Sequence, residues 1–389
     1  LVHVPVPSAL LEGQGIAVFR RDAGNAYVAL DYGHHGGGHG HPDRLNLLLS
    51  VGTERILDDF GTGSYVDRSL HWYRSTLAHN APLVNGRSQP RASGTLLAWD
   101  ERGDAGWVRA AATISDTPHV RAERALTVLP HVLVDELRWE ADEPVRLELP
   151  MHGTVRLQSD LERIAAPLDG GSGLEDGFAF VHDAERVIVE ENRIVRLSDA
   201  LSQVVIGWSS ASVDSEWWTA IAPGAPGQGD RRFVLVRMRG EAGRVRTVWS
   251  WPRWNWSGGV ADVRFADDQV LITHTDGAVT SYAWDNADAH DGPPDTMLAG
   301  QRASHPATAV APSPAPPLHT LPLVRDLGEP DYRASEPSWR DAGSPTARVT
   351  VRAVDDQLEV QVAVRKSPLV FRSPDAPDPA LDNESPDIN

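Results

Sequence analysis

The sequence predicts an all-β protein: a large antiparallel β-sandwich, then a Pro-rich linker and a partial second β-sandwich. Three observations predict this class. Short runs of alternating apolar and polar residues recur through residues 12–290, and turn-forming clusters such as Thr275-Asp276-Gly277 separate them. No window of a dozen residues has a clean 3.6-residue apolar period. Regular strand spacing without helices is typical of a sandwich.

The predicted strands share this alternation and a length of five to eight residues. They are Ala26–Leu30, Leu45–Leu49, Val108–Ile114, Ala125–Leu129, Val132–Trp139, Val145–Leu149, Arg186–Glu190, Val204–Trp208, Phe233–Met238, Arg246–Trp251, Val270–His274 and Val279–Trp284. We assign residues 1–290 to the first sandwich, within which a smaller β subdomain could begin near residue 215. In the Trp-rich run 249–256, we expect Trp249 and Trp251 to pack between sheets; a sugar-stacking surface is the alternative.

A composition shift separates the two domains. Residues 302–322 carry six prolines with many alanines, so we assign 291–322 to a stiff linker. Residues 323–389 resume strand patterning at Ala347–Val354 and Gln357–Val364. Two strands cannot close a core, so this domain is expected to be cut short. Residue 1 is leucine with no signal-peptide pattern, so the N-terminus is expected to be clipped as well.

Composition limits the function. The formal charge of −18 makes a nucleic-acid-binding surface improbable. The chain has no cysteine, so disulfides and thiolate metal sites are excluded, and any metal must be held by histidine and carboxylate ligands. The sequence contains no run of about 18 apolar residues, so no membrane-spanning helix is predicted. Nothing in the sequence indicates an oligomeric state.

The segment from Asp31 to Asn80 concentrates the candidate chemistry, because it holds six of the fifteen histidines. Its first part, 31–43, surrounds four histidines with five glycines, which lets the backbone fold tightly around one point. His39 and His41 form an H-x-H pair that would share one face of a strand. Asp58 or Asp59 could add a carboxylate and His79 a third imidazole, a set that suits zinc. The alternative is a hydrogen-bonded histidine cluster with a protonation role.

Three ordered motifs in this region resemble the heparinase II/III-like polysaccharide lyases, a family that includes heparin, heparan sulfate and alginate lyases. The motifs are Gly-His-Gly-His-Pro-Asp-Arg-Leu-Asn-Leu at 38–47, Ile-Leu-Asp-Asp-Phe-Gly-Thr-Gly-Ser-Tyr at 56–65, and Tyr-Arg-Ser-Thr-Leu-Ala-His-Asn at 73–80 with Val84-Asn85-Gly86 and Gln89. The resemblance implies a central β-sandwich that normally follows an N-terminal α/α toroid, which is expected to be missing here.

The resemblance also implies roles for individual residues. It places Zn²⁺ on His41, Asp59 and His79, and it puts His39 near the cleaved bond. Tyr65 or Tyr73 could match a sandwich tyrosine that touches substrate. The main catalytic tyrosine and the group that neutralises the uronate carboxylate belong to the toroid.

The implied function is β-elimination of a uronic-acid-containing polysaccharide of heparin, heparan sulfate or alginate type, by a bacterial protein that is secreted or periplasmic. As a fragment without its toroid, the chain is expected to be nearly inactive. One alternative is a non-catalytic, zinc-stabilised carbohydrate-binding protein. A weaker one is a zinc hydrolase, which would need a general-base glutamate, and only Glu54 lies within 31–80. Four arginines within 60–98 form a positive stretch that suits an acidic polysaccharide: Arg68, Arg74, Arg87 and Arg91.

The C-terminal region carries a second, looser resemblance. Asp326-Leu327-Gly328-Glu329-Pro330, Pro337-Ser338-Trp339 and Leu381-Asp382-Asn383-Glu384 are similar to the opening of a family 9 carbohydrate-binding module or a related DOMON-type sandwich. A generic β-sandwich appendage is the alternative.

Overall fold

The computed structural model describes most of the chain up to Ala283 and three strands beyond it. The described residues are 7–34, 39–103, 105–158, 160–190, 194–200, 205–251, 259–266, 269–283, 323–327, 346–354 and 357–365. The chain divides into two compact units, one of residues 1–63 and 68–303 and the other of residues 64–67 and 304–389. The structure is nearly all β with large antiparallel sheets, as the sequence predicts.

The first unit opens with a five-stranded antiparallel sheet whose strands follow chain order. They are β1 (Ala9–Leu11), β2 (Ile16–Arg21), β3 (Ala26–Asp31), β4 (Asn46–Val51) and β5 (Glu54–Leu57), with η1 (Asp22–Gly24) in the β2–β3 turn. Along β2, every second side chain is buried, including Ala17 and Phe19. The period of two places these side chains on one face, against the second sheet.

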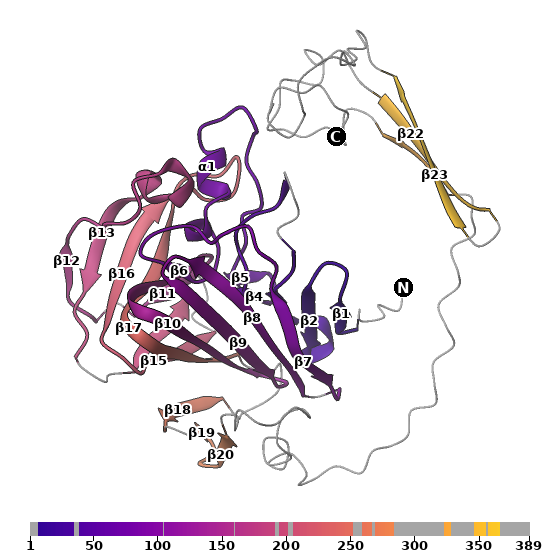
Figure 1. The fold of residues 1–389 in the computed structure, drawn as a ribbon. Coiled ribbons are helices and arrows are strands. Elements are labelled where there is room, and N and C mark those ends of the chain that lie inside the picture. Colours follow the sequence, from indigo (N-terminus) through magenta and orange to yellow (C-terminus); the bar gives the residue numbers. More distant parts are fainter. Residues whose placement is uncertain are drawn as a thin grey trace, which may run out of the picture. The chain divides into compact units, whose positions relative to one another are not determined.

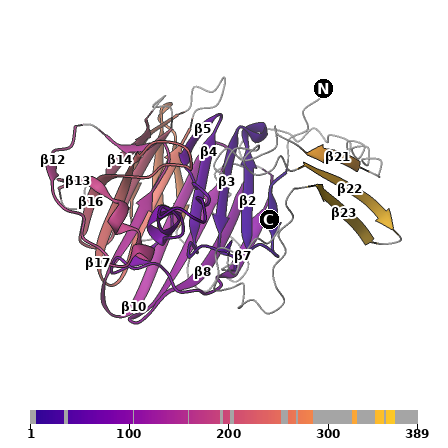
Figure 2. The ribbon, with the colours of Figure 1, turned by 90° about the horizontal axis from the view of Figure 1, so that it is seen from above.

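A twelve-stranded sheet forms the other layer of this unit (Figures 1 and 2). Its strands are β6 (Leu83–Val84), β7 (Thr95–Glu101), β8 (Gly106–Asp116), β9 (His119–Val128), β10 (Val132–Met151), β11 (Val155–Leu157), β12 (Arg163–Ala165), β13 (His182–Val187), β14 (Val195–Asp199), β15 (Ile206–Ala211), β16 (Ser215–Ala222) and β17 (Arg231–Ser250). The two longest strands, β10 and β17, pair with each other along nearly their whole length.

Each of these long strands was predicted as two shorter ones. The predicted breaks fall where the β10–β17 register shifts, between Glu140 and Val145. Polar residues interrupt the apolar alternation there, while the backbone continues through the irregularity.

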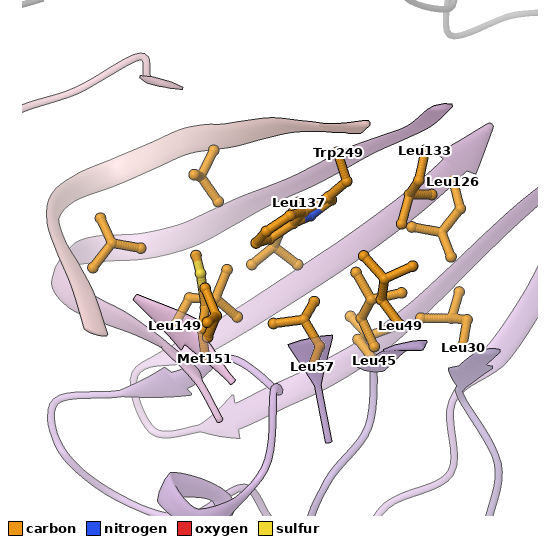
Figure 3. Close-up of a cluster of buried hydrophobic side chains, with 14 of the residues drawn as sticks. Leu30, Leu45, Leu49, Leu57, Leu126, Leu133, Leu137, Leu149, Met151 and Trp249 are labelled. Atoms are coloured by element: carbon orange, nitrogen blue, oxygen red, sulfur yellow. The ribbon is translucent and has the colours of Figure 1, made fainter. Parts of the chain in front are cut away.

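The main core lies between the two sheets. Leu30 and Leu49 of the five-stranded sheet face Leu126, Leu137 and Trp249 of the twelve-stranded sheet, and all five are nearly fully buried (Figure 3). Trp251 is buried in the same cluster. Core packing of Trp249 and Trp251 is therefore confirmed, whereas Trp254 and Trp256 lie outside the described residues.

A three-stranded sheet completes the first unit. It consists of β18 (Val260–Phe265), β19 (Gln269–His274) and β20 (Val279–Ala283). Val263 and Ile272 pack with Trp208 and Val248 of the large sheet in a separate buried cluster. This small sheet begins at Val260 rather than near residue 215, because β16 and β17 complete the twelve-stranded sheet.

The second unit holds a three-stranded antiparallel sheet of β21 (Leu323–Leu327), β22 (Thr346–Val354) and β23 (Gln357–Arg365). β22 and β23 match the two predicted strands. The predicted linker and the motifs at 337–339 and 381–384 lie outside the described residues.

The connection from β5 to β7 carries two of the short helices. It contains α1 (Leu70–Tyr73), η3 (Thr76–Ala78) and β6. Trp72 and Leu77 anchor it in a second core with Phe233 and Leu235 of β17, and η5 (Phe178–Phe180) adds Phe178, following η4 (Leu174–Asp176). This packing fixes the backbone that leads into His79.

Candidate metal centre

The loop that enters β4 carries the H-x-H pair. β4 begins at Asn46, so His39 and His41 lie before the strand and not on it. The predicted shared face is therefore absent: His39 is exposed, while His41 is half-buried. His35 and Gly36–Gly38 lie outside the described residues.

Arg44 and Gln89 hold this loop in place. The Arg44 guanidinium donates from Nη2 to the carbonyl oxygen of His41 at 2.7 Å and pairs with Asp43. The Gln89 amide accepts from the Arg44 N–H at 2.9 Å and donates to the carbonyl oxygens of Arg44 and Pro82, at 3.0 and 2.7 Å. The loop before β4 is thus tied to the segment that follows His79.

His79 forms the centre of the site. Its Nδ1 atom lies 2.9 Å from Oδ2 of Asp59 and 3.9 Å from Oδ2 of Asp43. The rings of His41 and His79 have centroids 5.1 Å apart. The donor atoms of His41, Asp43 and His79 all lie within 4.8 Å of one another. The structure therefore brings the predicted ligands His41 and His79 together with Asp43, and it places the third predicted ligand, Asp59, against His79.

Sequence reasoning missed Asp43. The signal was available, since His39, His41 and Asp43 form an H-x-H-x-D series at period two. Of the two neighbouring aspartates, Asp59 rather than Asp58 faces the site, in line with the predicted choice. Asp59 faces His79, while the Asp58 carboxylate lies 3.2 Å from Arg55 on the other side.

The tautomer of His79 is defined by its second nitrogen. Nε2 lies 3.1 Å from the carbonyl oxygen of Tyr73, which can only accept, so Nε2 carries a proton. Nδ1 therefore faces the carboxylates and is the nitrogen that a metal would take. A backbone carbonyl in this position is a typical second partner of a metal-binding imidazole.

Burial and neighbouring charges set opposite pKa shifts on the two imidazoles. Burial disfavours the charged form of His79, but the Asp59 carboxylate outweighs it and raises the pKa of His79 to about 9. Burial, with the charge of His79, lowers the pKa of His41 to about 4. Burial works against the Asp59 carboxylate, yet His79 holds the pKa of Asp59 well below its usual range. Without metal, the site thus carries one imidazolium beside one neutral imidazole.

The donor set fits zinc. Two imidazoles and two carboxylates are ligand types that zinc takes, and the cysteine-free chain provides no thiolate that would compete. His79, Asp43 and their immediate surroundings are buried. Burial suits an ion that joins chain segments.

Buried polar side chains support the ligands from behind. Asn46 donates to Oδ2 of Asp59 at 2.7 Å and accepts from the N–H of Asn80 at 2.9 Å. Arg124 of β9 donates to the carbonyl oxygens of Leu45 and Asn80, both at 2.8 Å. These links anchor both histidine segments to the sandwich, and sequence reasoning found neither Asn46 nor Arg124.

The two predicted tyrosines differ in their surroundings. Tyr73 is buried, and its hydroxyl donates to the carbonyl oxygen of Gly224 at 2.8 Å. A catalytic role for Tyr73 gains no support from this arrangement, which uses the residue for packing and for its carbonyl contact with His79. Tyr65 lies in the segment 64–67, which is grouped with the second unit, so its place relative to the histidines stays a prediction.

The four predicted arginines lie on the chain segments before and after His79. Arg87 and Arg91 are exposed on the segment after β6, and Arg68 is exposed over the ring of Phe180. Arg74 is half-buried, and its charge contributes to the lowered pKa of His41. Glu54, the general base that a zinc hydrolase would need, stands at the far end of β5 from Asp59. The four residues of β5 alone separate its ends by about 10 Å.

The family profile described as "Heparinase II/III-like, C-terminal" matches residues 4–218, which include the whole histidine cluster. The chain belongs to this family. The resemblance read from the three motifs is therefore confirmed.

Two relatives illustrate the match. An alginate lyase from Stenotrophomonas maltophilia (strain K279a) is 30% identical over 164 residues, covering 36% of this chain and 22% of that protein. The crystal structure of a heparan sulfate lyase from Pedobacter heparinus aligns with 72% of this chain and 42% of its own, with a TM-score of 0.51 and 10% identity. The second match shows a shared fold. The chain thus spans less than half the length of either relative.

Within the part of the chain that the structure describes, no helix is long and apolar enough to cross a membrane.

Proposed function

We propose that this sandwich forms one wall of the active site of a polysaccharide lyase that cleaves uronic-acid-containing chains by β-elimination. Heparin, heparan sulfate and alginate are the substrate types to which the family description and the two relatives point. The observation that carries the proposal is the family match over residues 4–218, because this stretch contains the histidine loop together with its supporting residues. Such substrates lie outside the cell, so we propose that the protein is secreted or periplasmic.

The chemistry needs three functions. A base removes the proton α to the uronate carboxylate, a cationic or hydrogen-bonding group neutralises that carboxylate, and an acid protonates the oxygen that leaves C4. His39 is the proton carrier that we propose from this chain, because it is exposed on the loop whose next histidine is anchored. Exposed arginines such as Arg87 and Arg91 suit the anionic substrate.

The metal is proposed to act as a structural cross-link. Zinc held by His41, Asp59 and His79 would supply a fixed junction between the β4 entry loop, the end of β5 and the η3 segment. Ordering a glycine-rich loop is costly in conformational entropy, and such a junction lowers that cost. The metal would then hold the loop rigid, and His39 would face the substrate from this fixed loop.

Part of the catalytic set is expected outside these 389 residues, since the chain covers 42% of the matched heparan sulfate lyase. When half of the groups of a proximity-dependent reaction are absent, the rate falls by on the order of 10⁵ or more. We therefore expect residues 1–389 alone to be nearly inert. A longer protein that contains them should release unsaturated uronate products.

The test follows the ultraviolet absorbance of the new C4–C5 double bond with heparin, heparan sulfate, alginate and hyaluronan as substrates. Activity of the longer protein on at least one substrate, lost in His39→Ala, is the expected result. No unsaturated product from any of them would contradict the proposal. Strong activity of residues 1–389 alone would instead place the full catalytic set within the sandwich.

A non-catalytic, zinc-stabilised carbohydrate-binding protein is the second candidate. The burial of His79 and Asp43 favours it, because a closed metal junction does not by itself require catalysis. Binding of the same polysaccharides by the longer protein without any cleavage would support this candidate over the lyase.

A further inference from the structure

We propose that Asp43 is a second carboxylate ligand, so that His41, Asp43, Asp59 and His79 form a closed, four-ligand metal site. The proposal rests on the metal site proposed above and not on lyase activity. It assigns a ligand that the sequence motifs did not, and it fixes what the ion can do.

The surroundings of Asp43 orient one of its oxygens toward the imidazoles. Oδ1 is paired with Nη2 of Arg44, and this guanidinium is itself held by the carbonyl oxygens of His41 and Ala92, at 2.7 and 3.1 Å. Oδ2 points to the cluster, 3.9 Å from Nδ1 of His79. Asp43 is only 8% exposed, so its carboxylate faces the protein interior and not solvent.

Of the two distances from Nδ1 of His79 to the carboxylates, one is shorter and the other longer than the separation of two ligand atoms in a zinc site. Zinc–nitrogen and zinc–oxygen bonds of about 2.0–2.1 Å at a tetrahedral angle put ligand atoms about 3.3 Å apart. Nδ1 of His79 lies 2.9 Å from Asp59 and 3.9 Å from Asp43. An ion that replaces the Nδ1 proton would lengthen the first distance and shorten the second, each by roughly half an ångström. Small side-chain rotations suffice for both changes.

Asp59 alone would leave the site open. Its Oδ1 accepts from the N–H of Gly61 at 2.7 Å, and its Oδ2 accepts from Asn46 at 2.7 Å, so it is placed to offer the ion one oxygen. Two imidazoles and this oxygen make three ligands, whereas a structural zinc site takes four. Among the described residues, Asp43 is the carboxylate whose donor atom groups with both imidazoles within 4.8 Å, while Asp59 adjoins this group through His79. With it, two carboxylates balance the charge of a divalent cation.

A closed site has a consequence for chemistry. No coordination position would remain for substrate or water, so the ion would join three chain segments without acting as a Lewis acid. Proton transfer would depend on groups outside the ligand set, of which His39 is the nearest in sequence.

The test uses the full 389-residue chain, stripped with a chelator and loaded with Co²⁺ as a spectroscopic probe. Four-coordinate Co²⁺ absorbs visible light several-fold more strongly than five- or six-coordinate Co²⁺, and an exogenous ligand shifts the bands only where it can bind the ion. We expect intense visible bands that do not change on addition of millimolar thiocyanate. Weak bands, a shift with thiocyanate, or failure to bind Co²⁺ would overturn the proposal.

Matched variants locate the ligands. Asp43→Asn and Asp59→Asn should each weaken zinc binding at least about tenfold, and Asp43→Asn should make the cobalt bands sensitive to thiocyanate. Asp58→Asn is the control, because its carboxylate faces Arg55, and it should behave as the wild type. Wild-type affinity and spectrum in Asp43→Asn would overturn the assignment. The wild-type thiocyanate experiment decides the point if a variant does not fold, and no readout depends on polysaccharide cleavage.

Discussion

Nδ1 of His79 lies 2.9 Å from Oδ2 of Asp59, and this contact helps to join the end of β5 to the segment after η3. The two residues are separated by the loop that contains α1, so their approach depends on how that loop packs. Trp72 and Leu77 supply this packing from within the loop. The ligand geometry is therefore a property of the second core as much as of the histidine motif.

Arg124 should be the most costly single residue to remove from the support of the site. Its guanidinium forms two contacts with Asp135, at 2.8 and 2.7 Å, while Nη1 holds two backbone carbonyls. Arg124→Met would leave the Asp135 charge buried and unpaired, which costs about 3–5 kcal/mol. Unfolding in denaturant measures this loss of free energy. Arg102→Met, which removes an exposed pair with Asp100, should cost less than about 1 kcal/mol. Equal losses of unfolding free energy in the two variants would contradict a stabilising role for the buried Arg124–Asp135 pair.

The folding stability should decrease at acid pH because His152 is buried in its neutral form. Burial lowers the pKa of His152 to about 4, and its Nε2 donates to the carbonyl oxygen of Leu77 at 2.7 Å. Between pH 6.5 and 4 the unfolded chain binds a proton that the folded protein excludes, so folding stability decreases as the pH falls. The loss across this window is about 3 kcal/mol.

The comparison for this pH effect is His152→Gln, whose amide can still donate to Leu77 but does not titrate. Unfolding free energies of the chelator-treated proteins, measured from pH 7 to pH 4, should show a shallower slope in the variant. Identical slopes would mean that His152 does not carry the acid sensitivity.

Gly86 should tolerate no side chain. Its φ is +69°, and a Cβ there would lie 2.7 Å from both Cα of Gly170 and the backbone nitrogen of Gly171. Left-handed strain and backbone overlap together should make Gly86→Ala destabilising by about 2 kcal/mol or more. Gly103→Ala has a similar φ of +79° but open space, so it should cost only about 1 kcal/mol. Thermal or denaturant unfolding measures the loss of stability in each variant. Equal losses in Gly86→Ala and Gly103→Ala would show that the backbone at Gly170 moves to make room for the added methyl group.

Period-two patterning predicted β19 because this strand buries alternate side chains, Val270 and Ile272. It missed β2, although that strand alternates in the same way. The pattern failed where a strand runs through a stretch of polar residues. β10 continues past the polar residues after Glu140, and no local pattern indicates this. Helix content was also predicted correctly, since the short turns α1 and η3 are held by tertiary packing and have no apolar period of their own.

The candidate site was predictable only in part. Motif spacing and the family resemblance pointed to His41, Asp59 and His79, which the structure brings together. Arg124 was not predictable, because its partners at Leu45 and Asn80 are backbone oxygens 79 and 44 residues away in sequence. Asp43 was overlooked although the expected strand would have placed it on the same face as His39 and His41.

Zinc content across three histidine variants tests the central claim most directly, namely that the H-x-H pair divides into a metal ligand and a residue for chemistry. Elemental analysis of the purified chain should give close to one zinc per wild-type molecule. His41→Ala and His79→Ala should lose the metal and lower the thermal midpoint, because a bound ion stabilises only the folded state. His39→Ala should retain the metal. Equal zinc in wild type and His41→Ala, or loss of zinc in His39→Ala, would contradict the account.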